Sequence, residues 1–125
     1  MLLFSIVMLA AQQASSEPLQ KDIVVIGTRL QRWQGTYQIR GSRMKCATKA
    51  STGDPEIDAI GCTAFEVCAN TLLTRIAASD DKSLAKAVRI SMKETIKQDL
   101  SACVGDKRAS LIAALAQRRL NEPAN

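Results

Sequence analysis

Histidine is absent from the 125-residue sequence. Without it the chain has no histidine acid or base, no Ser-His-Asp or Cys-His nucleophile and no histidine-containing zinc site. Aromatic residues are also scarce, with one Trp, one Tyr and two Phe. The core must therefore rest on aliphatic side chains, and few rings are free to stack on bases. We expect no metal, no cofactor and no nucleic-acid partner.

Closely spaced cysteine pairs are absent as well. The intervals between the four cysteines are 15, 5 and 34 residues. A thioredoxin-like redox motif needs Cys-x-x-Cys, and a four-cysteine zinc site usually has two close pairs. In an exported chain, an even number of cysteines predicts disulfides. The cysteines are Cys46, Cys62, Cys68 and Cys103.

No apolar run is long enough to cross a membrane. Residues 2–11 are almost all apolar, and small or polar residues follow up to Ser16. About ten residues cannot span a ~30 Å hydrocarbon core as a helix, so residues 1–16 are predicted to be a secretory signal peptide cleaved after Ala14 or Ser16. The alternative is a buried N-terminal helix. Export would place the mature chain, with no membrane span, in the periplasm or outside the cell.

A β-hairpin is the clearest local prediction. Gly41-Ser42 has the composition of a two-residue type II′ turn, whose first central position needs a positive φ. This turn pairs Arg40 with Arg43 and extends the pairing along both strands. Alternation then places apolar residues on one face: Trp33, Tyr37, Ile39, Met44 and Cys46. The other face is polar and basic.

The basic face of this hairpin is the candidate binding site. Formal net charge is +5, which favours anionic partners, and no acidic residue occurs from Ile23 to Gly53. The candidate anion-binding residues are Arg32, Arg40, Arg43, Lys45 and Lys49. Because like charges directly opposed across a hairpin are unfavourable, the Arg40–Arg43 pair makes sense if an anion occupies the face. The alternative is a solvated surface.

Residues 22–30, rich in β-branched side chains, predict a third strand beside the hairpin, with Gly27 at a bulge. This Asp-Ile-Val-Val-Ile-Gly-Thr-Arg-Leu segment resembles the TonB-box-like start of TonB-dependent outer-membrane receptors. Such a receptor needs several hundred residues for its barrel, so the chain itself is not one. The resemblance implies an exposed strand that a partner protein adds to its sheet.

Helices are expected after the hairpin. Asp54-Pro55-Glu56 predicts a helix start, Gly61 its end, and Thr63 with Glu66 a capping box that begins the next helix. A further helix is predicted over residues 82–103, with one apolar and one basic stripe. Gly105 would end it, and Asp106 would cap a fourth helix whose Leu111, Ile112 and Leu115 face inward. The basic stripe is interpreted as a solvated face: Lys82, Lys86, Arg89, Lys93 and Lys97.

The expected fold is α+β: a small hairpin or three-stranded antiparallel sheet packed on three to four α-helices and stapled by disulfides. A linker is expected over residues 17–21, a single domain over 22–120 and a disordered tail over 121–125. Ser51-x-Gly53-Asp54, Ile57-Asp58-x-Ile60-x-Cys62 and Cys68 resemble small exported alphaproteobacterial proteins of unknown function, sphingomonad proteins especially. That resemblance implies a cell-envelope location and no particular activity.

Three disulfide pairings are possible. If the helices on either side of residues 79–81 fold back on each other, Cys68 lies near Ser91 and cannot easily reach Cys103. We therefore expect Cys62–Cys103 together with Cys46–Cys68.

Three functions remain open. The first is a non-enzymatic envelope domain that binds a partner protein or scaffolds. The second is a polyanion-binding module for anionic lipid or glycan that uses the basic hairpin face. The third, an enzyme of unknown class, has the least support, because Glu56 and Glu66 are assigned to helix starts and Asp58 alone is not a site.

Overall fold

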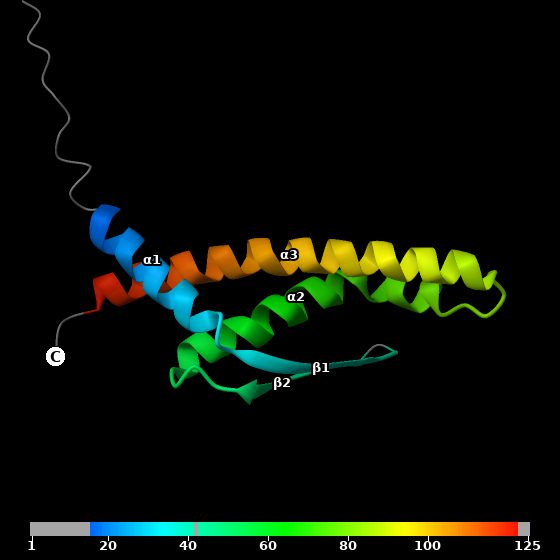
Figure 1. Cartoon of the computed structure of the whole chain (residues 1–125), viewed down its shortest axis with the longest axis horizontal. Coiled ribbons are helices and arrows are strands. Elements are labelled where there is room, and N and C mark those ends of the chain that lie inside the picture. The colour runs from blue at the N-terminus through cyan, green and yellow to red at the C-terminus, as the bar shows by residue number, and fades with distance from the viewer. Residues whose placement is uncertain (1–15, 42, 123–125) are drawn as a thin grey trace, which may run out of the picture.

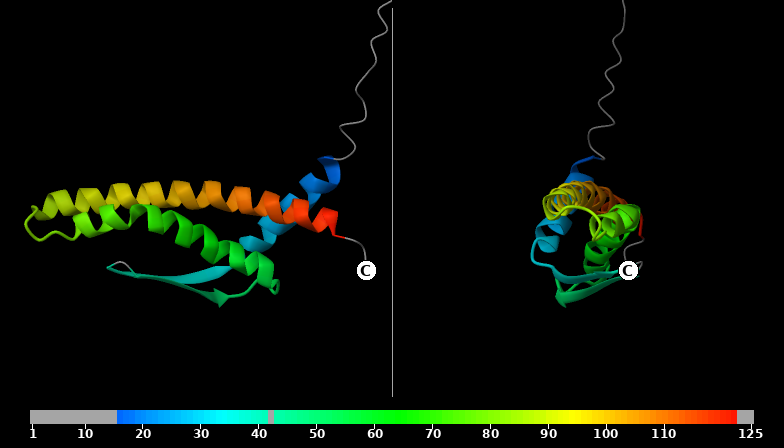
Figure 2. Two further views of the ribbon diagram at one scale, coloured as in Figure 1. Left: turned by 180° about the vertical axis from the view of Figure 1, so that it is seen from behind. Right: turned by 90° about the vertical axis from the view of Figure 1, so that its right-hand side faces the viewer.

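The computed structural model describes residues 16–41 and 43–122. Along the chain it contains α1 (Ser16–Leu30), β1 (Gln34–Arg40), β2 (Arg43–Ala50), α2 (Pro55–Ser79) and α3 (Lys86–Asn121). The helices α2 and α3 run side by side in opposite directions, and the hairpin lies along α2 on the side away from α3 (Figure 1). Seen from behind and end-on, the same layers appear, with α1 crossing them at one end (Figure 2). The expected α+β class is confirmed, with three helices and a two-stranded hairpin.

The hairpin has the predicted register. The structure pairs Arg40 with Arg43, and the three expected pairs beyond them follow in order as far as Tyr37 and Cys46. Gly41 has a φ of +60°, the conformation that favours glycine and that the turn prediction requires. A bulge between Gln34 and Gly35 shifts the register at the other end, so that Gln34 faces Ala50 and Gly35 faces Thr48.

The prediction of a third strand over residues 22–30 is wrong, because this segment belongs to α1. Leu19, Ile23, Ile26 and Leu30 follow helical spacing; Ile26 and Leu30 are buried, and the other two pack against them. A β-branched residue costs at most about 0.7 kcal/mol in a helix, whereas burying an Ile or Leu side chain contributes about 1.5–3 kcal/mol. Packing therefore outweighs intrinsic preference, and Gly27 lies inside the helix rather than at a bulge.

The predicted helix boundaries at Gly61 and Thr63 are also wrong. Asp54 does cap α2, accepting hydrogen bonds from the backbone N–H groups of Glu56 and Ile57, but the helix then continues to Ser79. Gly61 is buried, and a Cβ there would lie 2.6 Å from ring carbons of Trp33. A mid-helix glycine costs about 1 kcal/mol relative to alanine, and here it makes room for the indole.

One long helix replaces the two predicted after residue 82. α3 begins at Lys86 and runs without interruption through Gly105 and Asp106. The inward-facing residues were predicted correctly: Leu115 is buried, and Leu111 and Ile112 pack on the core.

The ends of the chain differ from the predicted layout. Residues 17–21, expected as a linker, form the first turns of α1. Of the expected tail, Asn121 ends α3, and residues 123–125 lie outside the described residues. The predicted signal peptide also lies outside them, except for Ser16, the first residue of α1.

The main hydrophobic cluster lies where α1 crosses α2 and α3, around Trp33. The indole N–H donates to the hydroxyl of Thr48 at 2.9 Å, and the Arg108 guanidinium lies 5.5 Å from the ring centroid. We call this the core end. Its buried residues are Ile26, Leu30, Trp33, Ile57, Ile60, Leu115 and Ala116. The hairpin turn at Gly41 points toward the opposite end, and the α2–α3 connection, residues 80–85, lies farther out at that end (Figure 1). We call this half of the molecule the turn end.

Candidate anion-binding surface

Two disulfides fix the hairpin and the long helices. All four cysteines are bonded, as predicted, but the predicted pairing is wrong. Cys46 joins Cys62, with 5.6 Å between the Cα atoms, and Cys68 joins Cys103, with 5.8 Å. Since α2 is continuous, Cys62 and Cys68 lie six residues apart on one helix and about 120° apart around its axis. Cys62 therefore faces β2, while Cys68, which is fully buried, faces α3.

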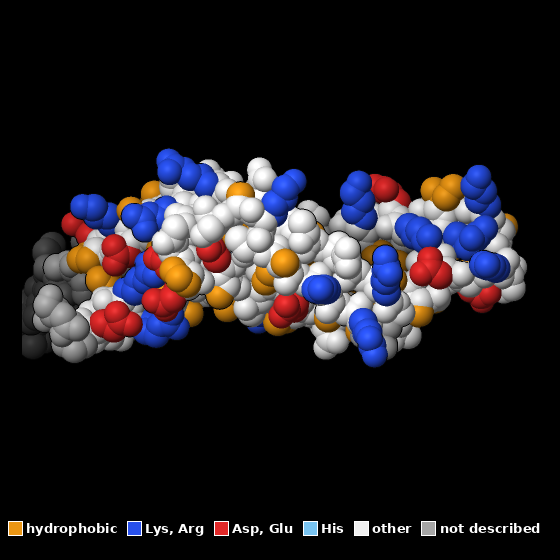
Figure 3. All heavy atoms as spheres, turned by 90° about the horizontal axis from the view of Figure 1, so that it is seen from below, with side chains coloured by type: hydrophobic (Ala, Val, Ile, Leu, Met, Phe, Trp, Pro, Cys, Tyr) orange, Lys and Arg blue, Asp and Glu red, His pale blue; other side chains and the backbone are white. Residues whose placement is uncertain are grey.

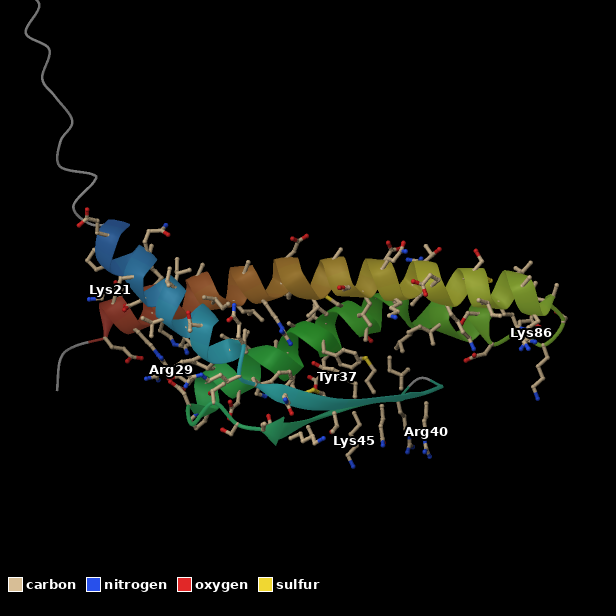
Figure 4. All side chains as sticks on the ribbon, in the orientation of Figure 1. Lys21, Arg29, Tyr37, Arg40, Lys45 and Lys86 are labelled. Atoms are coloured by element: carbon tan, nitrogen blue, oxygen red, sulfur yellow. A yellow bond between two sulfur atoms is a disulfide. The ribbon has the colours of Figure 1, made fainter. Side chains whose placement is uncertain are left out.

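The inner face of the hairpin packs on α2. The Tyr37 ring stacks on Phe65, with 4.1 Å between ring centroids, and points from β1 toward α2 (Figure 4). Ile39 and Met44 are half-buried near the turn. This packing and the Cys46–Cys62 bond leave the opposite face of the hairpin to solvent.

Three predicted site residues lie together on that outer face, near the hairpin turn. We call them the hairpin cations: Arg40, Arg43 and Lys45. Arg40 and Arg43 are directly opposed, all three are exposed, and together with Gln38 and Met44 they line a shallow depression. Arg40 and Lys45 point away from the helices (Figure 4). Seen from the hairpin side, Lys and Arg side chains gather over this part of the molecule (Figure 3).

The other two predicted site residues do not join this group. The register shift leaves Lys49 unmatched at the far end of the hairpin. Arg32 lies in the turn between α1 and β1, where the N–H groups of Arg32 and Trp33 donate to carbonyls of α1. The turn directs Trp33 into the core. Of the five predicted residues, the structure therefore brings three together.

The hairpin cations have no ionic partners among the described residues, as is true of most exposed basic residues of this chain; what distinguishes them is that they lie side by side. Among the described residues, no carboxylate forms an ion pair with any of the three. By contrast, Arg119 bonds Asp54 at 2.7 Å, Arg118 pairs with Glu56, and three-tenths or less of each Asp54 and Arg119 side chain is exposed. The unpaired cations concentrate positive potential at the hairpin turn.

Asp54 and Asp58, two acidic residues near the start of α2, have structural partners. Burial opposes ionisation of Asp54, but the hydrogen bonds from Arg119 and the α2 N-terminus hold the pKa of its carboxyl below the usual 3.8. Hydrogen bonds from Ser51 and Thr52 likewise lower the pKa of Asp58. Glu66 lies exposed in the middle of α2. Asp54 and Asp58 therefore fix the loop before α2 and its first turn rather than forming an acid–base pair.

The residues of the predicted basic stripe of α3 differ in their partners and in their exposure. Lys93 pairs with Asp80 at 3.0 Å, and Arg89 is half-buried. Lys82 lies in the α2–α3 connection and Lys86 begins α3; both are exposed. Sequence reasoning did not connect these two lysines with the hairpin. Their placement at the same end depends on how the elements pack, and no local pattern encodes it.

Neither a metal-binding cluster nor a membrane-spanning helix occurs among the described residues. Over residues 16–41 and 43–122, no three His, Cys, Asp or Glu side chains are grouped so that they could hold a metal ion. Within the same ranges, every helix is too short or too polar to pass through a bilayer.

Comparisons with known proteins return nothing. No family model, no curated protein and no solved structure matches the chain. The resemblances to TonB-dependent receptors and to small exported alphaproteobacterial proteins therefore stay predictions.

Proposed function

We propose that the protein is an exported, non-enzymatic envelope domain that binds anionic surfaces through the hairpin cations. The observation that carries this proposal is the placement of Arg40, Arg43 and Lys45. They lie side by side, exposed, on a face turned away from the helices, and no described carboxylate pairs with them. Phosphate, carboxylate or sulfate groups would supply the missing partners.

The two disulfides support the export part of the proposal. Disulfides persist in oxidising compartments such as the periplasm. The apolar run at residues 2–11 gives separate support, since it has the length of the apolar part of a secretory signal and is followed by small residues. We therefore favour the periplasm as the location of the protein.

Energetics favour an anion at this face. Directly opposed like charges destabilise a hairpin by about 0.2–1 kcal/mol. At an anionic membrane, each Lys or Arg near the surface contributes about 1 kcal/mol of binding. A bound anionic surface thus more than offsets the repulsion between Arg40 and Arg43.

A purely structural role is the second candidate. It is favoured by the exposure of these side chains, which lets the charges separate in water, where an exposed pair interacts weakly. In that case the basic face only keeps the hairpin hydrated, and the domain scaffolds or binds a protein through another surface.

Arg43→Thr separates the two candidates. For an anion site, binding to anionic vesicles falls by about 1 kcal/mol, while the free energy of unfolding rises slightly, because the repulsion is relieved and Thr is a good strand residue. Co-sedimentation with vesicles at low and high salt, beside thermal melts, measures both effects. High salt should abolish binding of the native protein, since it screens exposed charges.

Lys21→Gln is the matched control, because it removes one positive charge from α1, at the core end (Figure 4). It should leave vesicle binding nearly unchanged. If the native protein and Arg43→Thr bind anionic vesicles equally well, the anion-binding proposal is wrong. If Arg43→Thr and Lys21→Gln weaken vesicle binding equally, the effect depends only on the net charge of the protein and not on the hairpin cations.

A further inference from the structure

A groove lies between α1 and α3 at the core end, where the two helices cross (Figure 1). Its volume is about 470 Å³, within the range of about 300–1,000 Å³ that is usual for small-molecule sites. Residues three and four positions apart share one face of a helix, and each helix lines the groove with such a set. α1 contributes Val24, Gly27 and Thr28, and α3 contributes Gly105, Arg108 and Ala109.

Arg108 is the one charged residue among the described side chains that line this groove. It is half-buried, and its guanidinium lies 5.5 Å from the centroid of the Trp33 ring. No described carboxylate pairs with it, and its Nε–H is shielded from solvent without a hydrogen-bond acceptor. A donor left unbonded in this way is unfavourable. Arg108 therefore lacks a negatively charged partner that a bound ligand could supply.

The other half-buried arginines of the described chain are Arg89 and Arg119, and each has a carboxylate nearby. Arg119 bonds Asp54 at 2.7 Å. The Nε–H of Arg89 is also unbonded, but this arginine lies near Asp81. Hydrogen bonds from Ser83 and, less strongly, the charge of Arg89 lower the pKa of the Asp81 carboxyl. Arg108 has no such partner among the described carboxylates.

The walls beside Arg108 are largely apolar. Val24 is 65% exposed, and Ala109 and the half-buried Ile112 line the groove from α3. An inorganic anion would bind the guanidinium but leave this apolar surface in contact with water. An aliphatic chain would cover the surface, which is favourable, and one guanidinium matches one carboxylate, which it can bind through two parallel hydrogen bonds. The groove therefore fits a ligand with one carboxylate and an aliphatic chain.

We propose that this groove binds an aliphatic carboxylate. The carboxylate binds the guanidinium of Arg108, and the aliphatic chain lies along Val24, Ala109 and Ile112. The site is at the core end and does not involve the hairpin cations, so it goes beyond the proposed function. Arg43→Thr should bind an aliphatic carboxylate as well as the native protein does, and its vesicle binding tests the proposed function alone.

Decanoate, below its micelle concentration, is the probe. Calorimetry measures its affinity, and Trp33 fluorescence should change as the groove fills, because Trp33 is the single tryptophan of the sequence and lies against Arg108. Acetate, which has no chain, and decanol, which has no charge, should each bind at least roughly tenfold more weakly, since chain burial and a hydrogen bond to a charged group are each worth that much. Binding of acetate or decanol as tight as that of decanoate would overturn the proposal.

Two variants with the same charge loss test the role of Arg108. Arg108→Gln should weaken decanoate binding by roughly tenfold or more. Lys107→Gln removes the charge of the neighbouring residue on α3, which does not line the groove, and should change binding less than about twofold. Equal losses in the two variants would overturn the assignment of Arg108.

Gly105→Leu tests the groove without altering Arg108 or Trp33. A Cβ at Gly105 would meet no atom within 4 Å, and leucine is a better helix former than glycine, so the variant should melt no lower than the native protein. Its side chain occupies the groove and should weaken decanoate binding by roughly tenfold or more, because the chain loses its apolar contacts. Ser110→Leu, at an exposed position of α3 outside the groove, is the control and should bind normally. A folded Gly105→Leu protein that binds decanoate as tightly as the native protein would show that the groove is not the site.

Discussion

The two ends of the molecule use the same residue types in opposite ways. At the core end, Arg118 and Arg119 pair with Glu56 and Asp54, and Trp33 is buried against three helices. At the turn end, the hairpin cations and two lysines have no ionic partner in the described chain, and Val88 and Ile90 are exposed. The core end neutralises two arginines with the carboxylates at the start of α2, whereas the turn end leaves its cations exposed.

Under the proposed function, this difference would assign stability and binding to separate regions. Substitutions at the core end should change the free energy of unfolding and spare vesicle binding. Substitutions at the turn end should do the reverse. Three stability measurements test that division.

Trp33→Ala should have the largest effect. The ring fills the space beside Gly61 and Gly35, and its N–H bonds Thr48. Replacing a buried Trp with Ala costs about 3–5 kcal/mol. Val88→Ala, a matched apolar truncation at the turn end, should stay within about 0.5 kcal/mol of the native protein. Denaturant unfolding measures both. A Trp33→Ala loss below about 1 kcal/mol would mean that the core end is not the main source of stability.

Removing the disulfide of the hairpin should have the next largest effect. Cys46→Ala/Cys62→Ala opens a loop with a sequence separation of 16, worth about 3 kcal/mol in the chain-entropy model. Hydrogen exchange should then quicken in β1 and β2 more than in α3, because Cys68–Cys103 still joins the long helices. Uniform quickening would contradict this, and so would a non-reducing peptide map with other cysteine pairs.

The hairpin was predictable because its determinants are local. A glycine at a position needing positive φ and a two-residue alternation fix the register between Arg40 and Arg43 without help from the rest of the chain. The same locality places Arg40, Arg43 and Lys45 together on one face, as the alternation predicts. Lys49 and Arg32 lie elsewhere, because the bulge at Gln34 and the turn that buries Trp33 depend on packing.

The helices were mispredicted where packing overrides a local signal. Gly61 and Gly105 normally indicate helix ends, yet Gly61 is required by the indole against it. The wrong disulfide pairing followed from the assumed turn at residues 79–81, which placed Cys68 near Ser91. The connection covers residues 80–85 and α3 begins at Lys86, and Cys103 then lies beside Cys68.

In residues 22–30, the spacing of apolar residues indicates a helix: Leu19, Ile23, Ile26 and Leu30. The prediction gave more weight to the β-branched composition of residues 22–30 and therefore expected a strand.

The smallest expected effect concerns Asp54, which both caps α2 and pairs with Arg119. Asn is as good a helix cap as Asp, so Asp54→Asn removes the charge and keeps the cap. At pH 7 the loss should be about 0.5 kcal/mol, the range of a partly exposed ion pair. Asp54→Ala loses the cap as well and should cost about 1 kcal/mol more.

Acid should remove the difference between Asp54→Asn and the native protein. The pKa of Asp54 is lower in the folded chain than its ordinary 3.8, so the ionised carboxylate favours folding. That contribution is complete above 3.8 and disappears as the pH falls through the lower, folded value. Melting curves of the two proteins should therefore converge toward about pH 2, while Asp54→Ala stays less stable throughout. If Asp54→Asn stays less stable than the native protein by the same amount in acid, the asparagine side chain perturbs the cap itself. The Arg119 ion pair would then contribute nothing measurable to the stability of the core end.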